Sequence, residues 1–170
     1  GYMMAGGNIA DLSLGLKSGS NTTFTLNPKL GWFIQDRLAI GAEVLFGWSH
    51  LRGADVGDII NYGVGAFGRY YISDPSIEVV RRSRLFVEAN VGFNGRNQTK
   101  GGSSTNGIGF GIGPGFAYFI TDNIGLEAML KYNGVVGFGS DPYQHDLGFS
   151  VGFQVYLPGR AARDRVQSDF

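Results

Sequence analysis

Six charged residues stand out because each lies within a run of alternating apolar and small residues. Each takes the place of a Gly or small polar residue in the alternation. The six are Lys29, Glu43, Arg69, Glu88, Glu127 and Lys131. Residues two apart on a strand share a face, so these charges are expected on one surface. Isolated charges in a low-dielectric interior are costly, so we predict a structural ion-pair network. A narrow path for ions or protons is the alternative.

The two histidines offer a second kind of chemistry. Ser49 precedes His50, and Asp146 follows His145. Serine, histidine and an acid together can perform acyl transfer when they converge in space. Both pairs lie near the ends of alternating runs that are not consecutive in the sequence, and no catalytic motif surrounds them. We therefore predict ordinary rim histidines and no catalytic residues.

The glycines between Gly107 and Gly115 are spaced two apart. A phosphate-binding loop needs a different spacing and a following helix, and neither is present. There is no Cys, so disulfides and thiolate metal sites are excluded. We expect no metal and no cofactor.

The overall composition points away from an ordinary soluble domain. The 170 residues carry 14 Lys and Arg against 14 Asp and Glu, and this balance argues against nucleic acid as a partner. Charged residues make up 16 %, whereas about 25 % is usual. The 29 glycines accompany 14 % aromatics, which disordered segments lack. The opening Gly-Tyr-Met-Met has no leader-like pattern, so we expect a mature form if the protein is exported.

The elements that would position the charges are eight segments with period-two alternation, which is typical of strands. They span 8–17, 22–34, 38–50, 60–72, 83–97, 105–120, 124–133 and 143–157. One face of each is apolar, and the other is Gly, small polar and sparsely charged. A sheet closed in lipid has its apolar face outward and leaves no strand edge, so the pattern predicts an all-β, eight-stranded, antiparallel up-and-down transmembrane β-barrel.

The links between the segments differ in length. Those at 35–37 and 121–123 are short, whereas 18–21, 51–59, 98–104 and 134–142 are rich in Gly, Ser, Asn or Asp and mostly longer. Short turns on one rim and longer loops on the other are typical of outer-membrane barrels, with both termini periplasmic. The link at 74–82 is an exception, since it is long for the short-turn rim.

An internal repeat joins two of the turns. Gly-Trp-Phe-Ile-Gln-Asp-Arg-Leu-Ala-Ile-Gly at 31–41 is echoed by Ala-Tyr-Phe-Ile-Thr-Asp-Asn-Ile-Gly-Leu at 117–126, and more weakly by Arg-Tyr-Tyr-Ile-Ser-Asp at 69–74. These runs, with Gly-Phe-Ser-Val-Gly-Phe-Gln-Val-Tyr-Leu at 148–157, resemble the outer-membrane protein β-barrel family of small porin-like proteins over roughly 6–157. The resemblance implies a fold and a cell outer membrane location, and it carries no catalytic residues. Such proteins commonly stop at an aromatic in the last strand, whereas a polar segment follows here.

On this basis we expect a barrel over 1–157 and a polar periplasmic tail over 158–170. Aromatics near the strand ends should form interfacial belts: Trp32, Tyr70, Tyr71 and Tyr118 at one rim, and Trp48, Tyr62, Tyr132 and Tyr143 at the other. Pro28 and Pro114 should each cause a bulge or local strand break at equivalent depth.

The function that follows is a non-enzymatic structural or accessory subunit of an outer-membrane complex, with side chains filling the lumen. Its expected partners are outer-membrane lipid, lipopolysaccharide and other outer-membrane proteins. A lipid A-modifying enzyme at the outer rim and a narrow pore remain alternatives.

Overall fold

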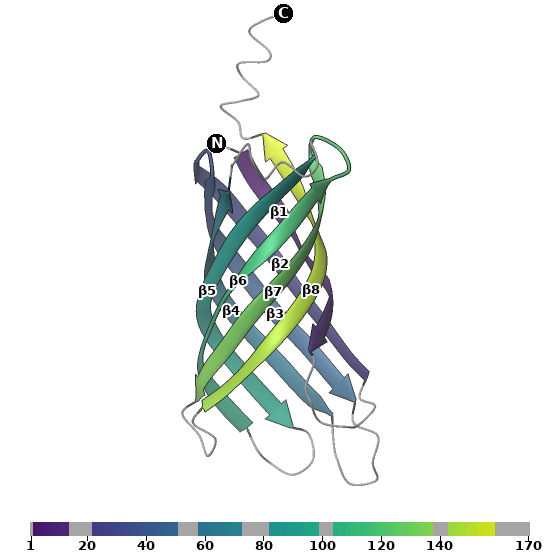
Figure 1. The fold of residues 1–170 in the computed structure, drawn as a ribbon. Helices are drawn as coiled ribbons and strands as arrows, with labels where there is room; N and C mark the ends of the chain where they lie inside the picture. Colours follow the sequence, from purple (N-terminus) through teal and green to yellow (C-terminus); the bar gives the residue numbers. More distant parts are fainter. Residues whose placement is uncertain are drawn as a thin grey trace, which may run out of the picture.

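The computed structural model describes residues 2–13, 22–50, 58–72, 82–98, 104–137 and 143–158. Eight strands follow one another along the chain and close into a barrel (Figure 1). They are β1 (Tyr2–Ser13), β2 (Thr22–Gln35), β3 (Leu38–His50), β4 (Ile59–Ile72), β5 (Ser83–Gln98), β6 (Ser104–Phe119), β7 (Ile124–Gly137) and β8 (Tyr143–Pro158). Within these residues, no helix has the length and apolarity needed to cross a membrane.

Every strand pairs antiparallel with its neighbours in sequence, and β1 pairs with β8 to close the barrel. The predicted fold class is therefore confirmed. Closure leaves no unpaired strand edge, which is the condition that lipid imposes on a sheet.

The predicted start of the first strand is wrong. β1 begins at Tyr2, six residues before the expected position, and its first residues pair with both β2 and β8. The alternation is blurred there because Met3 and Met4 are both apolar and Gly6 and Gly7 are both small. Hydrogen bonding to a neighbouring strand on each side therefore determines where β1 begins, although the alternation of its own residues does not. The predicted residues 14–17 lie outside the described part of the chain, and β7 continues four residues beyond its expected end.

Large apolar side chains cover the outside of the barrel. Phe93 is 68 % exposed and Val64 is 58 % exposed, and both lie well inside their strands. A water-facing surface with this much exposed apolar area would promote association, whereas lipid solvates it. The inverted arrangement predicted from the alternation is confirmed.

The start of β1, the end of β8 and two short turns lie at the same rim of the barrel, called here the short-turn rim (Figure 1). Asp36 and Arg37 form the turn between β2 and β3. In the turn between β6 and β7, the Thr121 hydroxyl oxygen accepts hydrogen bonds from the amides of Asn123 and Ile124, at 3.3 and 3.0 Å. The opposite end is called the long-link rim.

Pro28 and Pro114 interrupt the sheet without displacing it. Pro28 faces Gly7 on β1, but the ladder to β3 skips from Leu26 to Lys29 with unchanged register. Pro114 pairs with Val87 on β5, and the ladder to β7 skips from Ile112 to Gly115 in the same way. Because proline has no amide hydrogen, each ladder opens locally on one side. The expectation of a bulge or strand break is therefore wrong: β2 and β6 run unbroken through Pro28 and Pro114, and each proline only opens the ladder on one side, at equivalent places in the repeat.

Candidate functional site

The strand alternation directs all six predicted charged side chains into the barrel. Lys29 on β2 lies directly opposite Glu43 on β3, and Arg69 on β4 lies directly opposite Glu88 on β5. Each of the six residues is 7 % exposed or less: Lys29, Glu43, Arg69, Glu88, Glu127 and Lys131. We call this set the charge layer. The two register pairs place opposite charges face to face before any side chain adjusts.

Glu88 is the centre of the charge layer. Its Oε2 accepts hydrogen bonds from Nε and Nη2 of Arg69, at 2.9 and 2.7 Å. Its Oε1 accepts one from Nζ of Lys131 at 2.8 Å, and Lys29 also donates to it. One carboxylate is therefore held by three cations, the arrangement that compensates best for loss of hydration.

The other two acids complete the neutralisation. Glu127 Oε1 accepts a hydrogen bond from Nη1 of Arg69 at 2.6 Å. Glu43 Oε2 lies 3.2 Å from Nζ of Lys29, without hydrogen-bond geometry, and its Oε1 accepts from Asn90. Three acids and three bases thus balance across the barrel, and each charge contacts an opposite one.

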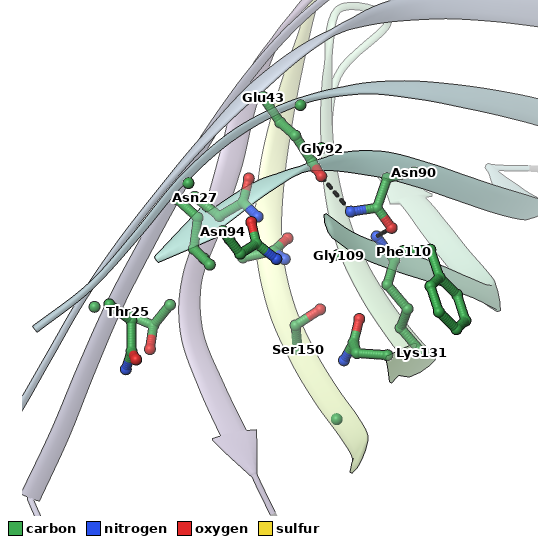
Figure 2. Close-up of a pocket in the computed structure, with 18 of the residues that line it drawn as sticks. Thr25, Asn27, Glu43, Asn90, Gly92, Asn94, Gly109, Phe110, Lys131 and Ser150 are labelled. Carbon is green, nitrogen blue, oxygen red and sulfur yellow. Dashed lines mark hydrogen bonds between the residues drawn. The ribbon is translucent and has the colours of Figure 1, made fainter. Parts of the chain in front are cut away.

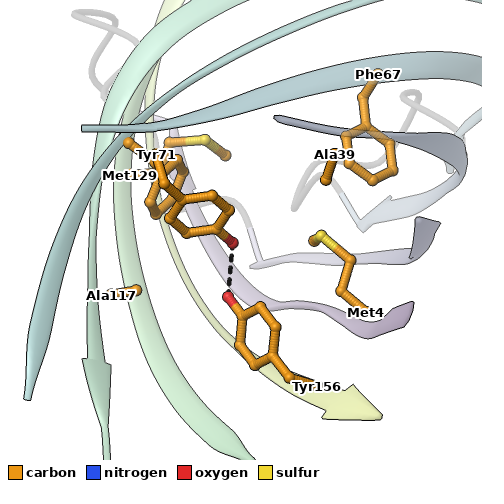
Figure 3. Packing of buried hydrophobic residues seen from close by; sticks show 8 residues of the cluster. Met4, Ala39, Phe67, Tyr71, Ala117, Met129 and Tyr156 are labelled. Carbon is orange, nitrogen blue, oxygen red and sulfur yellow. Dashed lines mark hydrogen bonds between the residues drawn. The ribbon is translucent and has the colours of Figure 1, made fainter. Parts of the chain in front are cut away.

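An inner aromatic cluster, which the sequence reasoning missed, lies between the charge layer and the short-turn rim. It consists of Phe33, Tyr71, Phe86, Phe119 and Tyr156, with ring centroids 5.3–6.5 Å apart in the contacting pairs. The hydroxyls of Tyr71 and Tyr156 are 2.6 Å apart (Figure 3). Tyr156 donates to Glu127 at 3.1 Å, and Nη1 of Arg69 donates to Tyr71 at 3.2 Å. The cluster is therefore hydrogen-bonded to the charge layer.

The prediction that Tyr71 belongs to an outer belt is wrong. Adjacent residues on a strand point to opposite faces, so Tyr70 is 48 % exposed on the outside while Tyr71 is 6 % exposed inside. Trp32-Phe33 and Tyr118-Phe119 behave alike, with the first aromatic exposed and the second packed inward. The aromatic pair of the internal repeat therefore supplies one ring to the outer face and one to the interior of the barrel. The repeat of adjacent aromatics was the sequence signal from which the inner aromatic cluster could have been predicted.

Two cavities lie inside the part of the barrel that the structure describes. A polar cavity of about 310 Å³ lies between the charge layer and the long-link rim. Glu43, Asn90 and Lys131 line its floor, which is the end nearest the charge layer (Figure 2). A second cavity of about 710 Å³ lies at the short-turn rim and ends at Phe33, Tyr71, Phe119 and Tyr156. Among the described residues, none lines both cavities. The charge layer and the aromatic cluster separate them.

Six of the eight aromatics predicted for the interfacial belts face outward and are 40–48 % exposed: Trp32, Trp48, Tyr62, Tyr70, Tyr118 and Tyr132. Tyr62 also donates a hydrogen bond to Asn106 Oδ1 at 3.0 Å. Tyr143 was expected in the same belt, but its side chain lies outside the described part of the structure.

The structure does not place the two histidines in one site. His145 is exposed on β8 and stacks on Tyr132 of β7, with ring centroids 6.1 Å apart. His50 lies on β3, where its backbone pairs with Thr22, and its side chain is not described. β3 and β8 are not neighbours in the barrel. In the described ranges, no group of three or more His, Cys, Asp or Glu residues could hold a metal ion.

Comparisons with known proteins agree on the fold. No protein-family model matches the sequence, and no curated protein sequence matches it. Among solved structures, Neisserial surface protein A is similar with a TM-score of 0.64 and 21 % identity, covering 91 % of this chain and 95 % of that one. The outer membrane protein OprG of Pseudomonas aeruginosa is similar with a TM-score of 0.54 and 12 % identity, and the match covers 93 % of this chain and 96 % of that one. The outer membrane enzyme PagL is similar with a TM-score of 0.50 and 16 % identity, and the match covers 91 % of this chain and 99 % of that one. The resemblance to small outer-membrane barrels is confirmed for the fold.

Proposed function

We propose that this protein is a non-enzymatic integral barrel of the bacterial outer membrane, acting as a structural or accessory component with a closed lumen. One observation carries the proposal: two separate interior cavities are divided by a neutralised charge layer and an aromatic cluster. An eight-stranded barrel is just wide enough for its interior to be filled by side chains. The apolar outer face supports insertion in lipid, and the outer-membrane barrels with the same fold support that location.

Planar-bilayer recordings test the closed lumen. We expect no steady conductance from the purified protein. A variant with Tyr71→Ala, Tyr156→Ala and Phe33→Ala removes much of the cluster and serves as a comparison with an enlarged interior. Stepwise, reproducible channels from the unaltered protein would overturn the closed-lumen proposal and favour the narrow pore.

The accessory role is tested by purification from native membranes in mild detergent. We expect one or more outer-membrane proteins to accompany the barrel in fixed proportion. A protein that always migrates alone would contradict the accessory version and leave a free-standing structural role.

Orientation forms part of the proposal, with both termini in the periplasm. The chain has no cysteine, so a single Asp36→Cys or Ala54→Cys substitution provides a unique label site. An impermeant maleimide added to intact cells should label the second variant and not the first. The reverse pattern would contradict the proposed orientation.

An enzyme at the long-link rim is the second candidate, because the outer membrane enzyme PagL has a similar fold. The separation of β3 and β8 and the stacking of His145 on Tyr132 give this candidate less support. Mass spectrometry of lipid A from cells with and without the protein decides between the two. A mass change that depends on the protein would favour the enzyme.

A further inference from the structure

The lining of the polar cavity is rich in asparagine. Six asparagines from five strands line it: Asn8, Asn27, Asn61, Asn90, Asn94 and Asn133. Thr25 and Ser150 add hydroxyl groups to the same wall. An asparagine amide both donates and accepts hydrogen bonds, so the wall presents both kinds of group without net charge.

Glycines on neighbouring strands make room for these amides. A Cβ atom at Gly109 or Gly63 would collide with the amide of Asn94. A Cβ atom at Gly111 would lie 2.8 Å from Oδ1 of Asn133 and would also meet Asn90. The amides of Asn90, Asn94 and Asn133 therefore pack closely against glycine backbone, and this close fit restricts their movement. Restricted polar groups lose less entropy when they bind a ligand.

One oxygen atom at the cavity lacks a hydrogen-bond donor. Oδ1 of Asn27 is buried and receives no hydrogen bond from the protein, whereas Oε2 of Glu43 is already paired with Nζ of Lys29 at 3.2 Å. A buried acceptor left unsatisfied costs about 1–3 kcal/mol, so a donor is expected there. The cavity volume of about 310 Å³ equals that of about ten water molecules and falls at the lower end of small-molecule sites.

We propose that the polar cavity binds a neutral polyhydroxylated molecule of about monosaccharide size. A hydroxyl group of the ligand donates to Asn27 Oδ1, and other hydroxyl oxygens accept hydrogen bonds from the asparagine amides. A charged ligand fits poorly, because Glu43 and Lys131 on the floor already contact opposite charges. An apolar ligand would strip water from the amides without replacing its hydrogen bonds. This binding function goes beyond the structural role proposed above.

Saturation-transfer NMR on the full chain in phospholipid nanodiscs tests the proposal, with glucose as the probe and empty nanodiscs subtracted. We expect a saturable signal from glucose and none from glucuronate, glucosamine or cyclohexanol. Maltotriose distinguishes the source: binding of both sugars indicates the end of a longer glycan, and binding of glucose alone indicates a free monosaccharide.

Matched substitutions locate the site. Asn27→Leu removes an unsatisfied acceptor with little change in volume and should weaken glucose binding about fivefold, the effect of one hydrogen bond. Asn97→Leu, at an exposed position on the outer face of β5, should leave binding unchanged. Asn61→Leu replaces the first variant if that protein does not fold. The proposal is overturned if glucose gives no saturable signal, if the charged sugars bind equally well, or if the cavity and surface variants bind glucose alike.

Discussion

Arg69 and Glu88 face each other across β4 and β5, and two guanidinium nitrogens of Arg69 donate to the same carboxylate oxygen, at 2.9 and 2.7 Å. The third guanidinium nitrogen reaches across the barrel to Glu127 at 2.6 Å. Arg69 therefore joins a pair fixed by strand register to a residue 58 positions away in sequence. The planar fork of arginine can hold two carboxylates at once, which a lysine ammonium would do with less directional control.

Glu88→Gln should destabilise the barrel by about 3–5 kcal/mol, because it leaves three cations without their shared carboxylate. Urea titration of the protein in lipid vesicles, followed by tryptophan fluorescence, measures the change. Asp36→Asn in the exposed turn is the control and should change stability by less than about 0.5 kcal/mol. Equal stability of the two variants would show that the charge layer contributes little.

The two buried tyrosine hydroxyls should act as one unit. Tyr156→Phe removes a group that contacts Tyr71 and donates to Glu127, and should cost about 1–2 kcal/mol. The double variant with Tyr71→Phe should cost less than the sum of the single changes, since it leaves no orphaned hydroxyl between the rings. A double-mutant cycle from the same urea titrations measures the coupling. Strict additivity would mean that the two hydroxyls are independent.

The strand number, the antiparallel order and the facing of the charged residues could all be predicted from the sequence. A period of two fixes which residues share a face, and eight such segments with turn signals fix the strand count. The facing pair of Lys29 with Glu43 flanks the two-residue turn at Asp36 and Arg37 and could be anticipated from it, whereas the link between β4 and β5 is too long to set the register of Arg69 with Glu88 by itself.

The contacts across the lumen could not be predicted in the same way. Arg69 meets Glu127 because the strands tilt and the barrel closes, and no local pattern records that geometry. The inward position of Tyr71 was missed for another reason. Two adjacent aromatics near a strand end resemble part of an outer belt, but adjacent residues on a strand point to opposite faces, so only one of the two can face lipid. The early start of β1 depends on pairing with both β2 and β8 rather than on its own alternation.

Glycines on the two faces should respond oppositely to alanine. A Cβ atom at Gly113, inside the barrel, would meet the backbone oxygen of Leu130 and lie 2.7 Å from Cα of Lys131. Gly113→Ala should therefore cost more than about 2 kcal/mol, because backbone cannot move aside. Gly68→Ala adds a methyl group where nothing lies within 4 Å, and should be neutral or stabilise by up to about 1 kcal/mol. Unfolding titrations of both variants would refute this account if their order were reversed.

The lipid-facing surface should reject charge according to depth. Val64 is exposed near the middle of β4, so Val64→Arg should cost about 2–4 kcal/mol when the protein is folded in a bilayer. Ile120 has similar exposure but lies at a short turn, where an arginine side chain reaches the headgroups. Ile120→Arg is therefore the matched control, with an expected cost below about 1 kcal/mol. Urea titrations in vesicles of one lipid compare the two directly. An equal cost at both positions would contradict a membrane centred on the middle of the strands.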